Sequence, residues 1–206
     1  MYCSNCGAEA TGNFCSKCGT SFSNVGRPVK SSNNSDWSNE VRYEVLVRIP
    51  EVREKISRHA GMAKKGFSSE EFLAFMDKIA PLGFSIEKLG SVVQPIYSQL
   101  GIKTGKEQME IIASPPGTVI VSTICSLARH GQVLQRVNQF DDGCLIEAVL
   151  PSDMWSFEGN VLASIRSEGI GSRVEVATVI KGQLFDWGKS KRCLETIFTD
   201  IKAIPA

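Results

Sequence analysis

The sequence predicts an α+β protein, and three observations lead to this fold class. Between residues 40 and 101, apolar side chains recur every three or four positions, which indicates helices. Between residues 132 and 180, four apolar segments of strand length follow one another, separated by turn residues. An amphipathic helix closes the chain. Because the strands come in a run and do not alternate with helices, we expect a curved antiparallel sheet wrapped around the last helix.

The beginning of the chain carries two cysteine motifs of the same pattern. Cys3 and Cys6 form one Cys-x-x-Cys pair and Cys15 and Cys18 form a second, with eight residues between the pairs and a glycine after each. Two such turns supply four thiolates in a tetrahedron, which is the shell that Zn²⁺ prefers. We therefore predict one structural zinc ion bound by Cys3, Cys6, Cys15 and Cys18. A shell of four thiolates has no open position, so this zinc is not expected to be catalytic.

Two disulfides or a redox motif are the alternatives to zinc. Disulfides require an oxidising compartment, and the chain starts at Met1 without the basic and apolar regions of a signal peptide. A redox Cys-x-x-Cys should follow a strand and open a helix, whereas here the same motif occurs twice. Residues 1–22 resemble the short zinc ribbons at the N-terminus of many bacterial proteins. So short a segment buries too little apolar surface to fold without its metal.

The composition is that of an ordinary globular protein. Of 206 residues, 42% are hydrophobic and 22% are charged, and the net charge is +1. No segment approaches the roughly 18 apolar residues of a membrane span, so we expect no span and a cytoplasmic location. Nucleic-acid binding draws most of its affinity from a surplus of Lys and Arg, which this chain lacks. Nucleic-acid partners are therefore not expected.

Residues 23–38 are rich in Ser, Asn, Gly and Pro, which predicts a flexible linker. We accordingly divide the chain into a zinc ribbon at 1–22, the linker at 23–38, a helical segment at 39–104 and an α+β domain at 105–206. A tethered ribbon suits a module that docks on a partner better than one that shapes an active site.

The apolar residues of the first element, residues 41–49, fit both the two-residue period of a strand and the 3.6-residue period of a helix. Every second residue from Val41 to Ile49 is apolar, as in a strand. Val41 and Ile49 also lie on one helical face, which Val52 and Ile56 extend beyond Pro50. Because that face continues, we predict a helix.

Two more helices are expected before residue 101. Ser68 and Glu71 have the spacing of a capping box, and the helix that they begin should end at the Pro-Leu-Gly sequence at 81–83. Ser85 can cap the next helix, which keeps a 3.6-residue period to residue 100 and should bend at Pro95.

The second half of the chain has the predicted order β-α-β-β-β-β-α. A strand at 109–113 leads through Pro115 and Pro116 into a helix at 118–130, with Gly131 just after its end. Strands follow at 132–140, 144–150, 160–167 and 173–180, the first two joined by an Asp-Asp-Gly turn. Asp186 can cap the last helix. Its apolar face comprises Leu194, Ile197, Phe198 and Ile201.

Three short segments carry a resemblance to a known superfamily. They are Ser114-Pro115-Pro116 before the first helix of this half, Gly171-Ser172-Arg173-Val174 at the last strand, and Phe185-Asp186-Trp187-Gly188-Lys189 before the last helix. With them, residues 110–206 resemble the small helix-grip domains of the START-like (SRPBCC) superfamily. The resemblance implies a pocket for a lipid or another hydrophobic small molecule between the sheet and the last helix.

No catalytic residue is predicted. The chain contains two histidines, His59 and His130, and neither lies in a recognisable catalytic motif. His130, just before Gly131, fits a helix C-terminus, where a positive charge is favourable. Cys125, Cys144 and Cys193 lie among apolar neighbours, so we expect them to be small buried side chains and not reactive thiols.

The sequence therefore favours a non-enzymatic zinc-binding protein. Its ribbon would be tethered to an α+β domain that binds a protein partner or a small apolar ligand. The alternative is an enzyme with its active site in the helix-grip pocket, which polar side chains converging on an enclosed cavity would support. A third hypothesis is nucleic-acid association through the ribbon, which would need a basic stripe joining Lys17, Arg27 and Lys30.

Overall fold

The computed structural model describes Lys17 and residues 37–63, 68–83, 106–152, 157–180 and 188–203. The chain divides into two compact units, Met1–Ser35 and Asp36–Ala206. All described helices and strands belong to the second unit. The four ribbon cysteines, the helix predicted after Ser85 and the predicted cap Asp186 lie outside the described residues.

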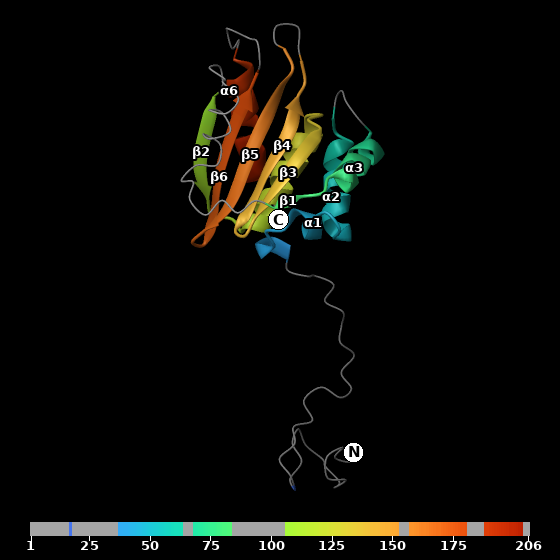
Figure 1. Ribbon diagram of the computed structural model, residues 1–206, viewed down its shortest axis with the longest axis vertical. Coiled ribbons are helices and arrows are strands. Elements are labelled where there is room, and N and C mark those ends of the chain that lie inside the picture. The colour runs from blue at the N-terminus through green and yellow to red at the C-terminus, as the bar shows by residue number, and fades with distance from the viewer. Residues whose placement is uncertain are drawn as a thin grey trace. The chain divides into compact units, whose positions relative to one another are not determined.

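A six-stranded sheet forms the centre of the second unit, in the order β1-β3-β4-β5-β6-β2 (Figure 1). The strands are β1 (Leu82–Gly83), β2 (Glu107–Ile112), β3 (Leu134–Phe140), β4 (Gly143–Leu150), β5 (Gly159–Glu168) and β6 (Gly171–Val179). The pairs are antiparallel except β1 with β3, which is parallel. The predicted α+β class is confirmed, as is the order of the elements in the second half of the chain. Strand β1 was not predicted, because its residues were assigned to the end of a helix.

Five α-helices and one short 3-10 helix accompany the sheet in the described part of the chain. They are η1 (Trp37–Asn39), α1 (Tyr43–Leu46), α2 (Pro50–Ala60), α3 (Ser69–Lys78), α5 (Pro116–Arg129) and α6 (Lys189–Ala203). Helices α5 and α6 pack against each other and on one face of the sheet, while α2 packs on α5 and α3 on α2. Figure 1 shows α6 behind the sheet and α2 and α3 beside it.

The segment with two periods is helical, but it is not one helix. Helix α1 ends after Leu46, and α2 begins at Pro50. Proline is favourable at the first helical position because the amide that it lacks would have no partner there. Tyr43, Leu46 and Val52 are buried in the same core as the sheet. Trp37, which the sequence analysis assigned to the linker, is also buried in that core.

The predicted helix ends at Ser68 and Gly131 are confirmed. The Ser68 hydroxyl accepts a hydrogen bond from the Glu71 amide at 3.2 Å, and the Glu71 carboxylate accepts one from the Ser68 amide at 2.8 Å. Gly131 has φ 65°, and it donates its amide hydrogen to Ala128. The next amide, of Gln132, donates to the Leu127 carbonyl at 2.9 Å. These two bonds form a Schellman motif, which ends α5.

The main core lies between the sheet and helices α5 and α6. Strands β4, β5 and β6 turn alternate side chains toward the helices, among them Cys144, Ile146, Ala163, Ile165, Val174 and Val176. The predicted face of α6 is buried in this core. Cys125, Cys144 and Cys193 are buried free thiols, as expected. Burial raises the pKa of the Cys125 and Cys144 thiols to about 12, which makes them inert at neutral pH.

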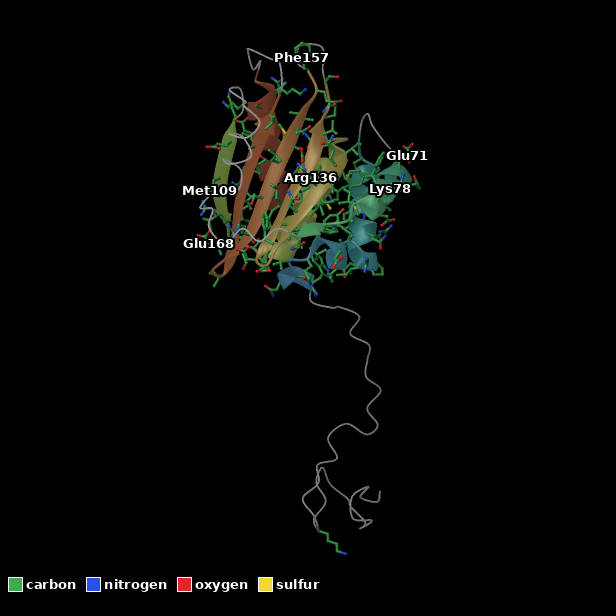
Figure 2. The ribbon with its side chains drawn as sticks, in the orientation of Figure 1. Glu71, Lys78, Met109, Arg136, Phe157 and Glu168 are labelled. Carbon is green, nitrogen blue, oxygen red and sulfur yellow. The ribbon has the colours of Figure 1, made fainter. Side chains whose placement is uncertain are left out.

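The opposite face of the sheet, here called the outer face, carries a second set of buried apolar side chains. Leu145, Leu162, Ala177 and Val179 are buried there, outside the main core. Arg136 and Met109, which point away from the sheet on this face, are labelled in Figure 2. The sheet is therefore buried on both faces at β4, β5 and β6.

Gln139 fixes the first helix to the sheet. Its side-chain oxygen accepts a hydrogen bond from the Tyr43 amide at 2.9 Å. Its Nε2 lies 2.9 Å from the Val41 carbonyl oxygen and 2.8 Å from that of Gly143. One side chain thus joins the start of α1 to the β3–β4 hairpin, although almost a hundred residues separate them in the chain.

We expect Gln139→Leu to lower the free energy of unfolding by about 2–3 kcal/mol, because it leaves several partly buried backbone groups without partners. Urea denaturation followed by circular dichroism measures this loss. Gln135→Leu is the matched control: Gln135 is exposed on the same strand, and its replacement should change stability by less than about 0.5 kcal/mol. Equal effects of the two substitutions would contradict the role given to Gln139.

Candidate functional site

An open groove runs between the C-terminal end of α5 and the surface of α6. Its volume is about 1050 Å³, and its lining includes Arg129 at the end of α5, His130 just after it, and Arg192, Thr196 and Thr199 from α6. The α6 residues recur three and four positions apart, which places them on one helical face. The face that α6 turns to the sheet, around Ile197, lies on the opposite side of the helix. The groove is therefore separate from the pocket that the helix-grip resemblance implies.

Asp200 is the centre of a hydrogen-bonded cluster at one side of this groove. Its side chain is 12% exposed. Its Oδ2 accepts a hydrogen bond from the Ser126 hydroxyl at 2.8 Å and lies 2.9 Å from His130 Nε2. Its Oδ1 lies 3.5 Å from Nη1 of Arg129. A carboxylate buried to this extent is stable only with such partners, so the cluster fixes the end of α5 to α6.

The geometry of this cluster is not that of a serine nucleophile with its base. In a Ser-His-Asp triad the serine hydroxyl is bonded to the imidazole. Here Ser126 is fully buried and donates its proton to Asp200. Because the carboxylate can only accept, the imidazole of His130 donates from Nε2. The arrangement can orient His130 and Arg129 at the groove, and it can present them to a ligand.

The exposed charged side chains that line the groove are two arginines, Arg129 and Arg192, and one carboxylate, Glu195. Arg129 and His130 have side chains that are 45% and 40% exposed. Asp200 is occupied by internal bonds, and the carboxylate of Glu195 lies 3.7 Å from the ammonium group of Lys191. A guanidinium group and an imidazole therefore face any molecule that enters, and they suit carboxylates or other anions.

A methionine also lines the groove, and a histidine lies on α2, the helix that packs against α5. Met62, which follows α2, is 52% exposed and supplies an apolar contact at the rim. His59 on α2 is not among the lining residues; burial and then the charge of Arg129 lower its pKa, so its imidazole is neutral at neutral pH. The groove thus combines cationic, hydroxyl and apolar contacts, as protein-binding surfaces do.

The sequence analysis predicted only part of this site. It placed His130 at the end of a helix, which is confirmed, but it gave no role to Ser126 or Asp200. The one usable signal was the spacing of Ser126, Arg129 and His130, which puts the three on one face of a helix. No sequence pattern near these three residues indicates that they contact Asp200. The predicted zinc ligands Cys3, Cys6, Cys15 and Cys18 lie outside the described residues, so zinc binding stays a prediction.

Family models, curated proteins and solved structures were each compared with the chain, and none matches it. Function is therefore inferred from the residues themselves. None of the helices in the described segments combines the length and the apolarity that crossing a bilayer requires.

Proposed function

We propose that the protein is a non-enzymatic, zinc-binding docking protein. In this proposal the ribbon at 1–22 holds one structural Zn²⁺ on Cys3, Cys6, Cys15 and Cys18. The α+β domain binds a protein partner in the groove between α5 and α6. The observation that carries the proposal is the groove itself, which is open, is lined by cationic, hydroxyl and apolar groups, and is fixed by the Asp200 cluster.

The fixed geometry of the groove supports binding to a partner. Ser126, Arg129 and His130 all meet the same carboxylate, so the walls formed by α5 and α6 keep their spacing. A wall that is already ordered loses little conformational entropy when a ligand binds. The open shape suits an extended segment of another protein better than it suits a small ligand, which usually lies in an enclosed cavity.

The division of the chain supports the docking part of the proposal. The boundary between the two compact units, after Ser35, falls within the segment whose composition predicts a linker. A zinc ion with four thiolate ligands offers no position for a substrate, so the ribbon has a structural role. Two modules on one linker can hold two surfaces together, which raises the effective concentration of one for the other.

Site-specific photo-crosslinking in cells that express the chain tests the groove. A benzoylphenylalanine in place of Glu195, whose side chain is 58% exposed in the groove, should form a covalent adduct with one protein. The control position is Glu168, which is exposed at the β5–β6 hairpin. The adduct should be absent from the control and should disappear when Thr199→Arg fills the groove. The same adducts from both positions, or none from Glu195, would contradict the proposal.

A further inference from the structure

Strand β2 lies at one end of the sheet and has an open side. In the strand order it is terminal, and among the described residues only β6 pairs with it. The Thr178 amide donates to the Lys106 carbonyl at 3.0 Å, just before the strand begins. In an antiparallel ladder such bonded pairs alternate with non-bonded ones. Glu107, Met109 and Ile111 therefore direct their backbone N–H and C=O groups away from β6.

The three residues of this open side all have exposed side chains, and two of them, Met109 and Ile111, are apolar. Met109 is 53% exposed and Ile111 is 56% exposed, and both project from the outer face of the sheet. Figure 2 shows Met109 at this edge. Natural edge strands are usually protected by a bulge, a proline or an outward lysine. Strand β2 contains no proline or lysine and no bulge, since its six register pairs with β6 are regular, and its one outward charge, Glu107, lies at its first position.

We propose that β2 pairs with β2 of a second copy of the chain, which joins the two sheets into one. Identical strands that pair antiparallel are related by a two-fold axis perpendicular to the sheet, so the outer face of one copy continues as the outer face of the other. This symmetry allows the register in which Glu110 lies opposite Glu110 of the second copy. Met109 then lies opposite Ile111 of the second copy, and each such pair exchanges two backbone hydrogen bonds.

This register is complementary on both faces. On the outer face, Met109 and Ile111 of the two copies come together as one apolar cluster, which removes the largest exposed apolar area of the strand from water. On the face toward the helices, Glu110 of each copy is already paired with Lys202 of α6 at 2.5 Å. This lysine holds the pKa of the Glu110 carboxyl below its usual value. Two carboxylates therefore meet together with two ammonium groups, and repulsion between them is offset.

Because the two paired strands are short, the interface between the copies is small, and the dimer should form only as the protein concentration rises. An interface of two six-residue strands is smaller than the roughly 1,600 Å² of a standard stable complex. The inference is independent of the groove, which lies between α5 and α6 and contains no residue of β2.

Sedimentation velocity of the full chain, from micromolar to near-millimolar concentration, tests the proposal. The wild type should pass from monomer to dimer. Met109→Pro removes an amide that points away from β6, so it should leave the fold intact and raise the dimer dissociation constant by roughly tenfold or more. Ile111→Lys should also raise the dimer dissociation constant, because it replaces an exposed apolar side chain of the interface with a charged one. This variant tests the proposal even if the proline variant does not fold.

The control is Ile170→Lys at the β5–β6 turn. Ile170 is 99% exposed, so its replacement removes exposed apolar surface without touching β2, and the dimer should be unchanged. A wild type that stays monomeric throughout would overturn the proposal. So would a dimer that persists in both β2 variants, or a monomeric chain whose β2 instead recruits a strand from a different protein.

Discussion

Cys6→Ser is expected to release the zinc ion and unfold the ribbon, while the α+β domain keeps its own melting transition. Structural zinc sites contribute on the order of 10 kcal/mol or more to folding, and a ribbon of this size has no other source of comparable stability. The α+β domain should not respond, because together with the helices that precede it in the chain it forms a separate compact unit, Asp36–Ala206. Native mass spectrometry measures zinc per chain, and calorimetry measures the domain transition.

A second serine substitution gives the reciprocal control. Cys125 is fully buried in α5, so Cys125→Ser places a hydroxyl among apolar side chains and should lower the Tm of the domain. The zinc content of the Cys125→Ser variant should stay at one ion per chain. Loss of the domain transition in Cys6→Ser would mean that the ribbon is part of the domain core. If the wild-type protein contains no zinc when it is purified without a chelator, the proposed zinc site is contradicted.

Gly117→Ala is expected to lower the free energy of unfolding by about 3 kcal/mol or more, although alanine is the better helix former. An added Cβ would lie 2.2 Å from the Trp37 carbonyl oxygen and 2.7 Å from that of Glu40. Both are backbone atoms, so relief requires η1 to move and Trp37 to leave the core. In a helix interior where there is room, the same change would stabilise by about 1 kcal/mol. Whether Gly117→Ala lowers or raises the free energy of unfolding therefore tests the close approach of η1 to α5.

Gly61→Ala is the matched control for this prediction. Gly61 has φ −65° at the end of α2, and the nearest atom to an added Cβ is the Ser69 hydroxyl oxygen at 3.2 Å. This oxygen belongs to a small side chain that can adjust, so the free energy of unfolding should change by less than about 1 kcal/mol. Urea denaturation of the three proteins gives both values. Equal stability of Gly117→Ala and wild type would show that η1 does not hold its position against α5.

The local signals in the sequence predicted most of the fold. The capping box at Ser68 and the glycine after His130 act within a few residues, and both helix ends were correct. The four strands from β3 to β6 were predicted to within about two residues, because their apolar residues and turns are contiguous in the chain. Features that depend on one neighbourhood of the chain were thus accessible to pattern analysis.

The features that were missed depend on contacts distant in the sequence. Strand β1 has two residues and exists only because Leu82 and Gly83 pair with β3. Trp37 follows a polar segment, so composition alone placed it in the linker, whereas its contacts place it in the core. The Asp200 cluster joins residues that are 74 positions apart, and no periodicity connects them. Such contacts follow from tertiary packing, which overrides local preference.

The burial of the three domain cysteines would make covalent thiol labelling a measure of occupancy of the proposed zinc site. Of the seven cysteines in the chain, Cys125, Cys144 and Cys193 are buried in the domain, and burial raises the pKa of each of their thiols. Alkylating reagents attack thiolates, so they should spare these three side chains in the folded protein. Every label taken up under native conditions then belongs to Cys3, Cys6, Cys15 or Cys18. If the proposed zinc site exists, counting labels by intact mass would report the fraction of chains in which it is empty.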